Sequence, residues 1–182
     1  MKITYFVNTM FLIEGKHSRI LTDPWVTSDN ISRSGLYNFP KLKVKKKDLS
    51  KVKPDFIYIS HTHADHFDPD TLNCFNKSTP ILISWYKENF TEKAIKGLGF
   101  KDIRVSPKNK PIILNKNDKC WIEPSAIYST VDSLAVFEVD GYKIFNPNDC
   151  GFEKKQAEAI KMKFKKFDAA LIPSGMQGPY PA

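Results

Sequence analysis

The sequence predicts a single α/β (α+β) domain built in layers. Two short apolar runs, at residues 55–60 and 80–84, have the length of strands buried on both faces, and a helical segment follows each. Asp140-Gly141, placed between two strand-like runs, is the strongest short-range signal for a hairpin. Alternating strands and helices are typical of sheets covered by helices. The 182 residues suffice for one domain, with an N-terminal half of about 1–115 and a C-terminal half of about 116–182.

The N-terminal half begins with a hairpin pattern. Residues 3–13 are rich in β-branched and aromatic side chains, and residues 14–17 form a turn before a strand at 18–22. Asp23-Pro24 ends this hairpin, because proline cannot continue the ladder of hydrogen bonds. Scattered Ser, Asn, Gly and Pro predict a surface loop over 27–40, and modest amphipathic spacing predicts a short helix over 46–52.

The centre of the chain alternates strands and helices. The strand at 55–60 leads directly into a cluster of histidines. Asp68-Pro69 predicts the start of a helix through about Asn76, since aspartate is a favoured N-cap and proline a favoured first helical residue. A strand at 80–84 then precedes a helix over 87–96, which Gly97 closes.

The C-terminal half repeats this theme. Segments 121–124 and 126–128 are strand-like, and 134–139 with 142–145 form the predicted hairpin. Composition and spacing predict a helix over 153–167, followed by a final buried strand at 168–173.

Composition indicates a globular protein without a membrane span. Apolar residues make up 41% and charged residues 26%, and no run approaches the ~20 apolar residues that a span needs. The N-terminus begins as a short β-like run without the features of a signal peptide, so a cytoplasmic location is expected. Three cysteines far apart, Cys74, Cys120 and Cys150, fit reduced thiols. Cys150 is interpreted as a small buried hydrophobe, with a soft metal ligand as the alternative.

The net charge of +8 is concentrated in two lysine-rich stretches, at 41–47 and 154–166. Such stretches are usually solvated faces. The chain has few arginines and no nucleic-acid-binding module, so a small-molecule substrate is expected and a nucleic-acid partner is disfavoured without being excluded. An oligomer is left open.

Three of the four histidines, His61, His63 and His66, fall within six positions, and Asp65 lies between the last two. Imidazole and carboxylate are ligands that zinc and similar metals prefer. Side chains two apart on an extended segment point to the same side, so His61 and His63 can act together. Asp65 and His66 follow as the chain turns. The loop could therefore serve two metal ions about 3.5–4 Å apart, the spacing of dinuclear hydrolytic sites.

Ser60-His61-Thr62-His63-Ala64-Asp65-His66 resembles the HxHxDH motif of the metallo-β-lactamase superfamily. The resemblance extends upstream to residues 11–15 and 20–25, similar to the family's opening hairpin, and downstream to 140–149, similar to the hairpin that ends in its bridging aspartate. In all it covers about residues 3–175. It implies a four-layer αββα sandwich with the metals at one edge.

The resemblance also implies roles for individual residues. His61 and His63 would hold a first metal ion, and Asp65 and His66 a second. Asp149 would bridge the two ions, and Asp23 would brace the metal loop from behind. A bridging hydroxide would be the nucleophile, and Asp65 would orient it. Taken alone, Asp149 after a strand is most often a turn or cap residue, and only its register with the family motif indicates a ligand.

Two departures from the family pattern make the site poor in imidazole. No histidine lies between residue 120 and Asp149, where Asp132 takes the expected place as either a carboxylate ligand or a turn cap. No histidine follows His66 at all, although the family carries one after the strand at 170–173. Zinc, up to two ions, is the expected cofactor, and a single ion, or iron or manganese, is the alternative.

Phrases around 131–134, 148–150, 174–175 and 179–181 resemble a sub-branch of the superfamily. It contains proteins related to CMP-N-acetylneuraminate hydroxylase and to N-acyl-phosphatidylethanolamine phospholipase D-like hydrolases. Members are longer than 182 residues, so the resemblance implies an incomplete C-terminal half that lacks the last strands and helix, with an intact short variant as the alternative.

Four functions remain open at this point. The first is a hydrolase of an ester, phosphoester or amide-type substrate that uses metal-bound hydroxide. The second is an iron-dependent, oxygenase-related protein acting on a sugar or nucleotide-sugar. The third is a catalytically impaired homologue that still binds metal or a partner. The fourth, a nuclease of the same superfamily, draws on the +8 charge.

Overall fold

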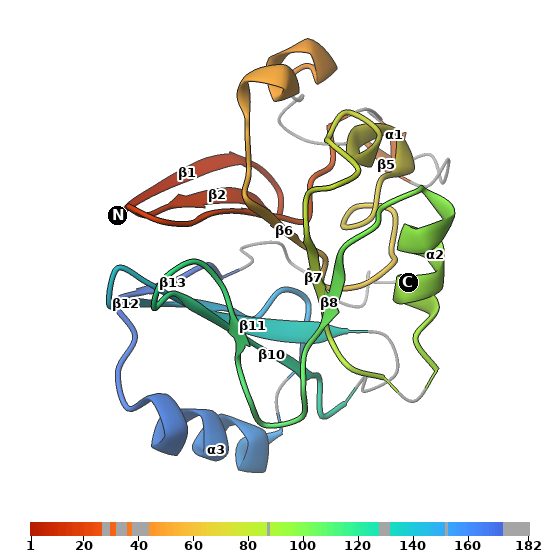
Figure 1. Ribbon diagram of the computed structural model, residues 1–182. Coiled ribbons are helices and arrows are strands. Elements are labelled where there is room, and N and C mark those ends of the chain that lie inside the picture. Colours follow the sequence, from red (N-terminus) through yellow and green to blue (C-terminus); the bar gives the residue numbers. More distant parts are fainter. Residues whose placement is uncertain are drawn as a thin grey trace.

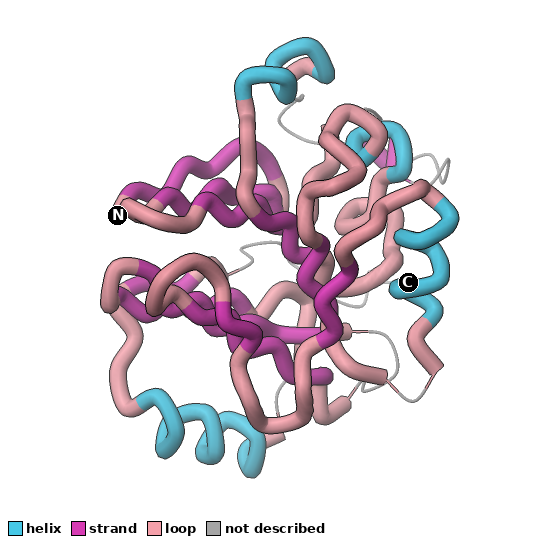
Figure 2. Tube along the Cα trace, viewed as in Figure 1, coloured by secondary structure: helices cyan, strands magenta, loops and turns pink. Residues whose placement is uncertain are grey.

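Two β-sheets pack face to face, and helices cover their outer faces (Figure 1). The computed structural model describes residues 1–26, 30–31, 36–37, 44–86, 88–127, 132–151 and 153–172, with the backbone alone at 30–31 and 36–37. Helices lie outside the two groups of strands (Figure 2). The order of layers is helix, sheet, sheet, helix, which confirms the predicted αββα sandwich.

The first sheet comes from the N-terminal part of the chain and has the order β1-β2-β3-β6-β7-β8. Its strands are β1 (Lys2–Val7), β2 (Met10–Glu14), β3 (Arg19–Thr22), β6 (Phe56–Tyr58), β7 (Ile81–Ile83) and β8 (Ile103–Val105). The first three strands are antiparallel, and β3, β6, β7 and β8 run parallel to one another. The carboxyl ends of the parallel strands therefore meet at one edge.

The second sheet has the order β13-β12-β11-β10-β9. Its strands are β9 (Ile112–Ile113), β10 (Lys119–Pro124), β11 (Ser133–Val139), β12 (Tyr142–Asn146) and β13 (Ala169–Ala170). All pairs are antiparallel except β12 with β13. The predicted Asp140-Gly141 hairpin is confirmed, with both residues at positive φ, 52° and 80°, as a tight two-residue turn requires.

Three hydrophobic clusters fill the spaces between the layers. Along β6, Phe56 and Tyr58 face the second sheet, whereas Ile57 joins the cluster beneath the N-terminal helices. Along β11, Ala135 and Phe137 face the first sheet, whereas Leu134 and Val136 pack against the C-terminal helix. This alternation is the period of two expected for strands covered on both sides.

The helices fill the outer layers. They are the 3₁₀ helix η1 (Lys46–Lys51), α1 (Pro69–Leu72), α2 (Phe90–Gly97) and α3 (Lys154–Phe164). Leu49, Leu72 and Ile95 anchor the first three against the first sheet. Ile160 and Phe164 anchor α3 against the second sheet. None of the helices in the described ranges combines the length and apolar character needed to cross a bilayer.

Several predicted boundaries were wrong. Residues 3–13 form two strands rather than one, because Asn8 takes a positive φ of 46° and turns the chain back on itself. Helix α1 has Asp68 as its N-cap, as predicted, but ends at Leu72 rather than near Asn76, and the turn after it carries Phe75 into the core. The predicted loop over 27–40 contains a short pair, β4 (Asn30–Ile31) with β5 (Leu36–Tyr37), and its remaining residues lie outside the described ranges.

Two further errors concern the C-terminal half. Ala126 and Ile127 are not in a strand, because the Ala126 N–H donates to the Gln156 side chain of α3 rather than to a neighbouring strand. The strand predicted at 168–173 is the short edge strand β13, with Ala170 exposed rather than buried. Residues 128–131 and 173–182, on which parts of the sub-branch resemblance and the predicted incomplete end rest, lie outside the described ranges.

Candidate metal centre

The predicted ligand residues meet where one edge of each sheet comes together. Asp23 follows β3 and His61 lies three residues after β6, two parallel strands whose carboxyl ends share an edge. In the second sheet, Asp132 immediately precedes β11 and Asp149 lies three residues after β12. Because β11 and β12 are antiparallel, these two carboxylates also share an edge. The N-terminal half thus supplies imidazoles and the C-terminal half supplies carboxylates.

A single turn folds the histidine loop back on itself. The N–H groups of His66 and Phe67 both donate to the carbonyl oxygen of His63, over 3.0 and 2.8 Å. This turn brings the His66 ring to within 4.1 Å of the His61 ring, between centroids. The predicted local grouping of the histidines is therefore present.

His61 is buried and faces both His63 and Asp132. Its Nε2 lies 2.8 Å from His63 Nδ1 and 3.4 Å from Asp132 Oδ1. On the other side of the ring, Nδ1 lies 3.0 Å from Ser60 Oγ. Ser60 Oγ gives its only proton to Asp23 Oδ2, so it accepts from His61 Nδ1. The Nε2 lone pair of His61 then points into the site, as metal ligation requires.

His66 lies between two carboxylates. Its Nδ1 is 3.0 Å from Asp23 Oδ2, and its Nε2 is 3.2 Å from Asp149 Oδ2. Asp23 is fully buried and also accepts the N–H and the hydroxyl of Ser60, each over 2.8 Å. Asp23 therefore contacts the metal loop from behind, in the bracing position that the family resemblance implies.

The pKa values of the two buried histidines are shifted in opposite directions. Burial, together with the charges of His66 and His63, lowers the pKa of His61 to about 3, so that this ring is neutral. Burial would also lower the pKa of His66, but its hydrogen bonds to Asp149 and Asp23 outweigh burial and raise the pKa to about 10. Burial raises the pKa of both Asp23 and Asp132. The carboxylates of Asp149 and Asp23 thus favour the protonated, positively charged form of the His66 ring.

The donor atoms fit a metal ion. Two groups, His61 with His63 and Asp132, and His61 with His66 and Asp149, each offer one ligand atom per residue within 4.8 Å of one another. His61 belongs to both groups. Asp132 is 5% exposed, and its Oδ1 accepts no hydrogen bond within the described part of the chain. A buried carboxylate oxygen without a donor is costly unless a cation faces it, so this arrangement suits a bound cation.

The remaining predicted residues lie differently. Asp65 is outside both groups, about a third exposed, with its Oδ2 3.6 Å from His66 Nε2. His17 is exposed on the turn between β2 and β3. Cys150 is buried against Leu134 and Val136, and burial raises its pKa to about 12, which fits the interpretation as a small hydrophobe.

Sequence reasoning missed the polar groups behind the site. Tyr58, Ser133 and Asn148 form a buried hydrogen-bonded cluster beside the ligands. A tyrosine inside the apolar run 55–60 was the available signal, because a buried hydroxyl needs a partner. Ser60 and Thr9 also approach His66 Nδ1, at 3.2 and 3.4 Å.

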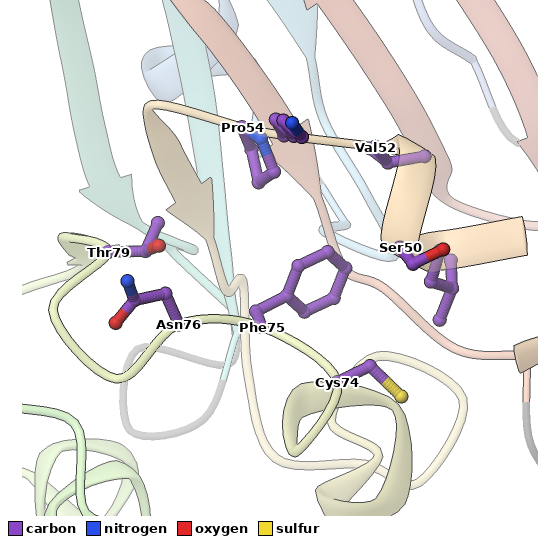
Figure 3. Close-up of a pocket in the computed structure, with 9 residues that line it drawn as sticks. Ser50, Val52, Pro54, Cys74, Phe75, Asn76 and Thr79 are labelled. Carbon is purple, nitrogen blue, oxygen red and sulfur yellow. The ribbon is translucent and has the colours of Figure 1, made fainter. Parts of the chain in front are cut away.

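A separate pocket of about 340 Å³ lies at the other end of the parallel strands of the first sheet, near their amino ends. Figure 3 shows it between the segment that leads into β6 and the loop that follows α1, with Val52, Pro54, Phe75 and Thr79 in its lining. Pro54 and Thr79 precede β6 and β7, whereas the histidine loop follows β6. None of the candidate metal ligands lines this pocket.

Comparisons with known proteins agree with this architecture. Cytidine monophosphate-N-acetylneuraminic acid hydroxylase of Asterias rubens is 25% identical over 154 residues, which cover 82% of this chain and 23% of the relative. The chain spans about a quarter of the length of the curated relatives it matches.

Two solved structures share the fold. An isothiocyanate hydrolase from Delia radicum gut bacteria has a TM-score of 0.69 and 20% identity, over 91% of this chain and 69% of its own. A mutant of the CmlA beta-hydroxylase has a TM-score of 0.71 and 12% identity, over 92% of this chain and 34% of its own. The family model described as a beta-lactamase superfamily domain matches residues 2–177. With this match, the αββα layers and the histidine loop at the shared sheet edge, the chain belongs to the metallo-β-lactamase superfamily.

Proposed function

We propose that this chain is a metal-dependent hydrolase domain acting on a small molecule with an ester, phosphoester or amide-type bond. The observation that carries the proposal is the pair of two-histidine, one-aspartate groups that share His61. Five side chains from two sheets converge there without a structural need for so many imidazoles and carboxylates in one place. Zinc is the proposed metal, at up to two ions.

The proposed ligands are His61, His63 and Asp132 in one position, and His61, His66 and Asp149 in the other. This differs from the family assignment, in which Asp65 with His66 holds the second ion and Asp149 bridges both. Because Nδ1 of His61 is hydrogen-bonded to Ser60, only its Nε2 lone pair is available, so His61 would hold one ion at a time and a second ion would rely on the other two residues of its group. A bound divalent ion would lower the pKa of a coordinated water and polarise the substrate oxygen. Asp65 is proposed to accept a proton from that water, because its carboxylate is accessible and lies beside His66.

The chain's own groups prepare the ligands. Ser60 fixes the His61 ring through Nδ1 and leaves Nε2 facing the site. Asp23 fixes the His66 ring through Nδ1 and directs Nε2 toward Asp149. Hydrogen bonds of this kind to the outer nitrogen of a ligating histidine orient the ring and increase its basicity.

An iron-dependent oxygenase-related function is the second candidate. Two histidines and one carboxylate form the ligand set of many non-haem iron oxygenases, and both groups in this chain have that composition. One relative and one structural neighbour are named as hydroxylases, which also supports the oxygenase-related candidate. The identity of the metal separates the two candidates.

The test is metal analysis of the purified chain together with hydrolysis of a panel of activated esters, phosphodiesters and lactams. We expect zinc to copurify and a chelator to abolish turnover. His61→Ala should lose tight metal binding, because His61 belongs to both groups. His17→Ala is the matched control, since His17 is an exposed histidine outside the site.

Each outcome has a distinct meaning. Iron in place of zinc, with no hydrolysis, would favour the oxygenase candidate. Metal binding without turnover of any substrate would favour the catalytically impaired homologue. Wild-type protein that retains no metal after incubation with zinc and iron would refute the proposal.

A further inference from the structure

A buried polar cluster joins the two sheets directly behind the candidate metal site. Tyr58 on β6 is fully buried and lies in the core between the sheets, with its ring edge-on to Phe137 of β11. Its hydroxyl lies 3.0 Å from Ser133 Oγ and 3.1 Å from the Ser133 carbonyl oxygen. The amide of Asn148 donates to the Tyr58 hydroxyl over 3.2 Å. One hydroxyl therefore connects three segments of the chain.

Each of these segments carries a proposed metal ligand. Ser133 follows Asp132, and Asn148 precedes Asp149. Ser133 Oγ donates to the Ser60 carbonyl oxygen over 2.8 Å, and Ser60 precedes His61. The cluster thus bonds the neighbours of three ligands that come from two different sheets.

Counting protons gives the direction of each hydrogen bond. The Ser133 hydroxyl gives its proton to Ser60, so Tyr58 is the donor between them, and its single proton is shared between the hydroxyl oxygen and the carbonyl oxygen of Ser133. Asn148 gives one amide proton to the Tyr58 hydroxyl and the other to the Ser133 carbonyl oxygen, over 3.2 Å each. Every donor in the cluster then has an acceptor, and the Tyr58 hydroxyl both donates and accepts. Removing that oxygen leaves the Asn148 amide with an unmatched buried donor.

The backbone at Asn148 is adapted to this contact. Its φ is 50°, in the left-handed region that asparagine tolerates better than most residues. This conformation lets the side chain turn back into the core while the chain continues to Asp149. The side chain is 2% exposed, so its hydrogen bonds form away from solvent.

We propose that Tyr58 is a positioning residue that sets the carboxylates of the second sheet, Asp132 and Asp149, against the histidines of the first. The inference rests on the proposed metal-dependent function. It assigns the relative placement of the proposed metal ligands to one hydroxyl group. Strand pairing within each sheet cannot fix the carboxylates relative to the histidines, because the two halves of the site belong to different sheets. The Tyr58 hydroxyl acts through the ligand-bearing segments and contacts none of the reacting groups.

The test compares Tyr58→Phe with wild type in the full chain, using Zn²⁺ for affinity and Co²⁺ for the absorption spectrum of the site. The variant keeps the ring and removes only the hydroxyl. We expect metal affinity to fall by about 10- to 100-fold, as for other groups that orient metal ligands. The Co²⁺ spectrum should also change, which a purely structural role would not produce.

The matched control is Asp140→Gly. Asp140 lies at the opposite end of β11, where its carboxylate accepts the N–H of Lys16 across the sheets over 3.0 Å. Glycine tolerates its φ of 52°. This variant should lose stability and keep both metal affinity and the Co²⁺ spectrum. If Tyr58→Phe does not fold, Asn148→Gly removes the Asn148 hydrogen bonds of the cluster and keeps those between Tyr58 and Ser133; metal affinity should fall and the Co²⁺ spectrum should change in the same direction.

Three results decide the matter. Unchanged affinity and spectrum in Tyr58→Phe, while His61→Ala loses metal, would overturn the positioning role and leave the proposed function standing. Equal losses of affinity in Tyr58→Phe and Asp140→Gly would overturn it as well, because general destabilisation would then explain both. Failure of the wild type to bind metal would instead refute the proposed function.

Discussion

At the scale of single residues, the site depends on which atom of each histidine carries a proton. Asp23 presents only acceptor oxygens to His66 Nδ1 and to Ser60. An aspartate at this point therefore keeps Nδ1 protonated, so that Nε2 is the nitrogen that faces Asp149 and would bind a metal ion on losing its proton. The full burial of Asp23 excludes water as a substitute partner.

Replacing this aspartate with asparagine tests the role of the acceptor. In Asp23→Asn the new NH₂ group would face Ser60 Oγ and His66 Nδ1, and His66 would have to place its proton on Nε2. We expect metal affinity to fall by about 10- to 100-fold, measured by competition with a chromophoric chelator. Asp55→Asn is the control, because Asp55 accepts an N–H from Arg19 at the surface. Affinity unchanged in Asp23→Asn would contradict the role assigned to Asp23.

At the scale of elements, turns set how closely the two sheets approach. Gly15, in the turn between β2 and β3, lies against the end of β11. A Cβ at this position would meet Val139 Cγ1 at a clashing distance and Asp140 Oδ2 at 3.1 Å. The absence of a side chain at Gly15 therefore permits the close contact of the two sheets at this end.

Gly15→Ala should destabilise the fold by about 1–3 kcal/mol, the usual cost of an overpacked contact. The measurement is the free energy of unfolding from urea titration. Gly97→Ala is the comparison, because a Cβ at Gly97, the last residue of α2, meets nothing within 4 Å. Alanine there should be neutral or stabilise by up to about 1 kcal/mol, given its higher helix propensity. Equal destabilisation by both variants would show that the contact with Val139 is unimportant.

At the scale of the whole molecule, the candidate site joins the two halves of the sandwich. The three histidines belong to loops of the first sheet, and Asp132 and Asp149 belong to the second. A metal ion held by both sets would bind only when the sheets are packed together. Metal binding and global folding should therefore be coupled.

Metal at about 100 times its dissociation constant should stabilise the chain by about 2.7 kcal/mol. For a domain of this size, the melting temperature should rise by about 5–10 °C. Differential scanning calorimetry with Zn²⁺, and again after addition of a chelator, measures the shift and its reversal. His61→Ala should show no shift and His17→Ala the full shift. A rise in melting temperature that persists in His61→Ala would place the bound metal elsewhere.

Much of this architecture was predictable because it depends on local patterns. The apolar run 55–60 marked β6, Asp140-Gly141 marked the β11–β12 hairpin, and Asp68-Pro69 marked the start of α1. His61, His63 and His66 likewise lie within one loop, so their spacing is a local pattern. In each case the information is contained in a few neighbouring residues, so that propensity and periodicity suffice.

Tertiary structure decided the rest, because it concerns residues far apart in the chain. The sequence left Asp132 equally balanced between ligand and turn cap, and packing of the two sheets brings it to 3.4 Å from His61. The same packing of the two sheets places Asp149 beside His66. Asp65 is nearer to His66 in sequence but lies outside both ligand groups. The histidine motif alone predicted a metal site at the end of β6, and the structure places candidate ligands there. Which carboxylates face it depends on the contact between two sheets, which no local pattern encodes.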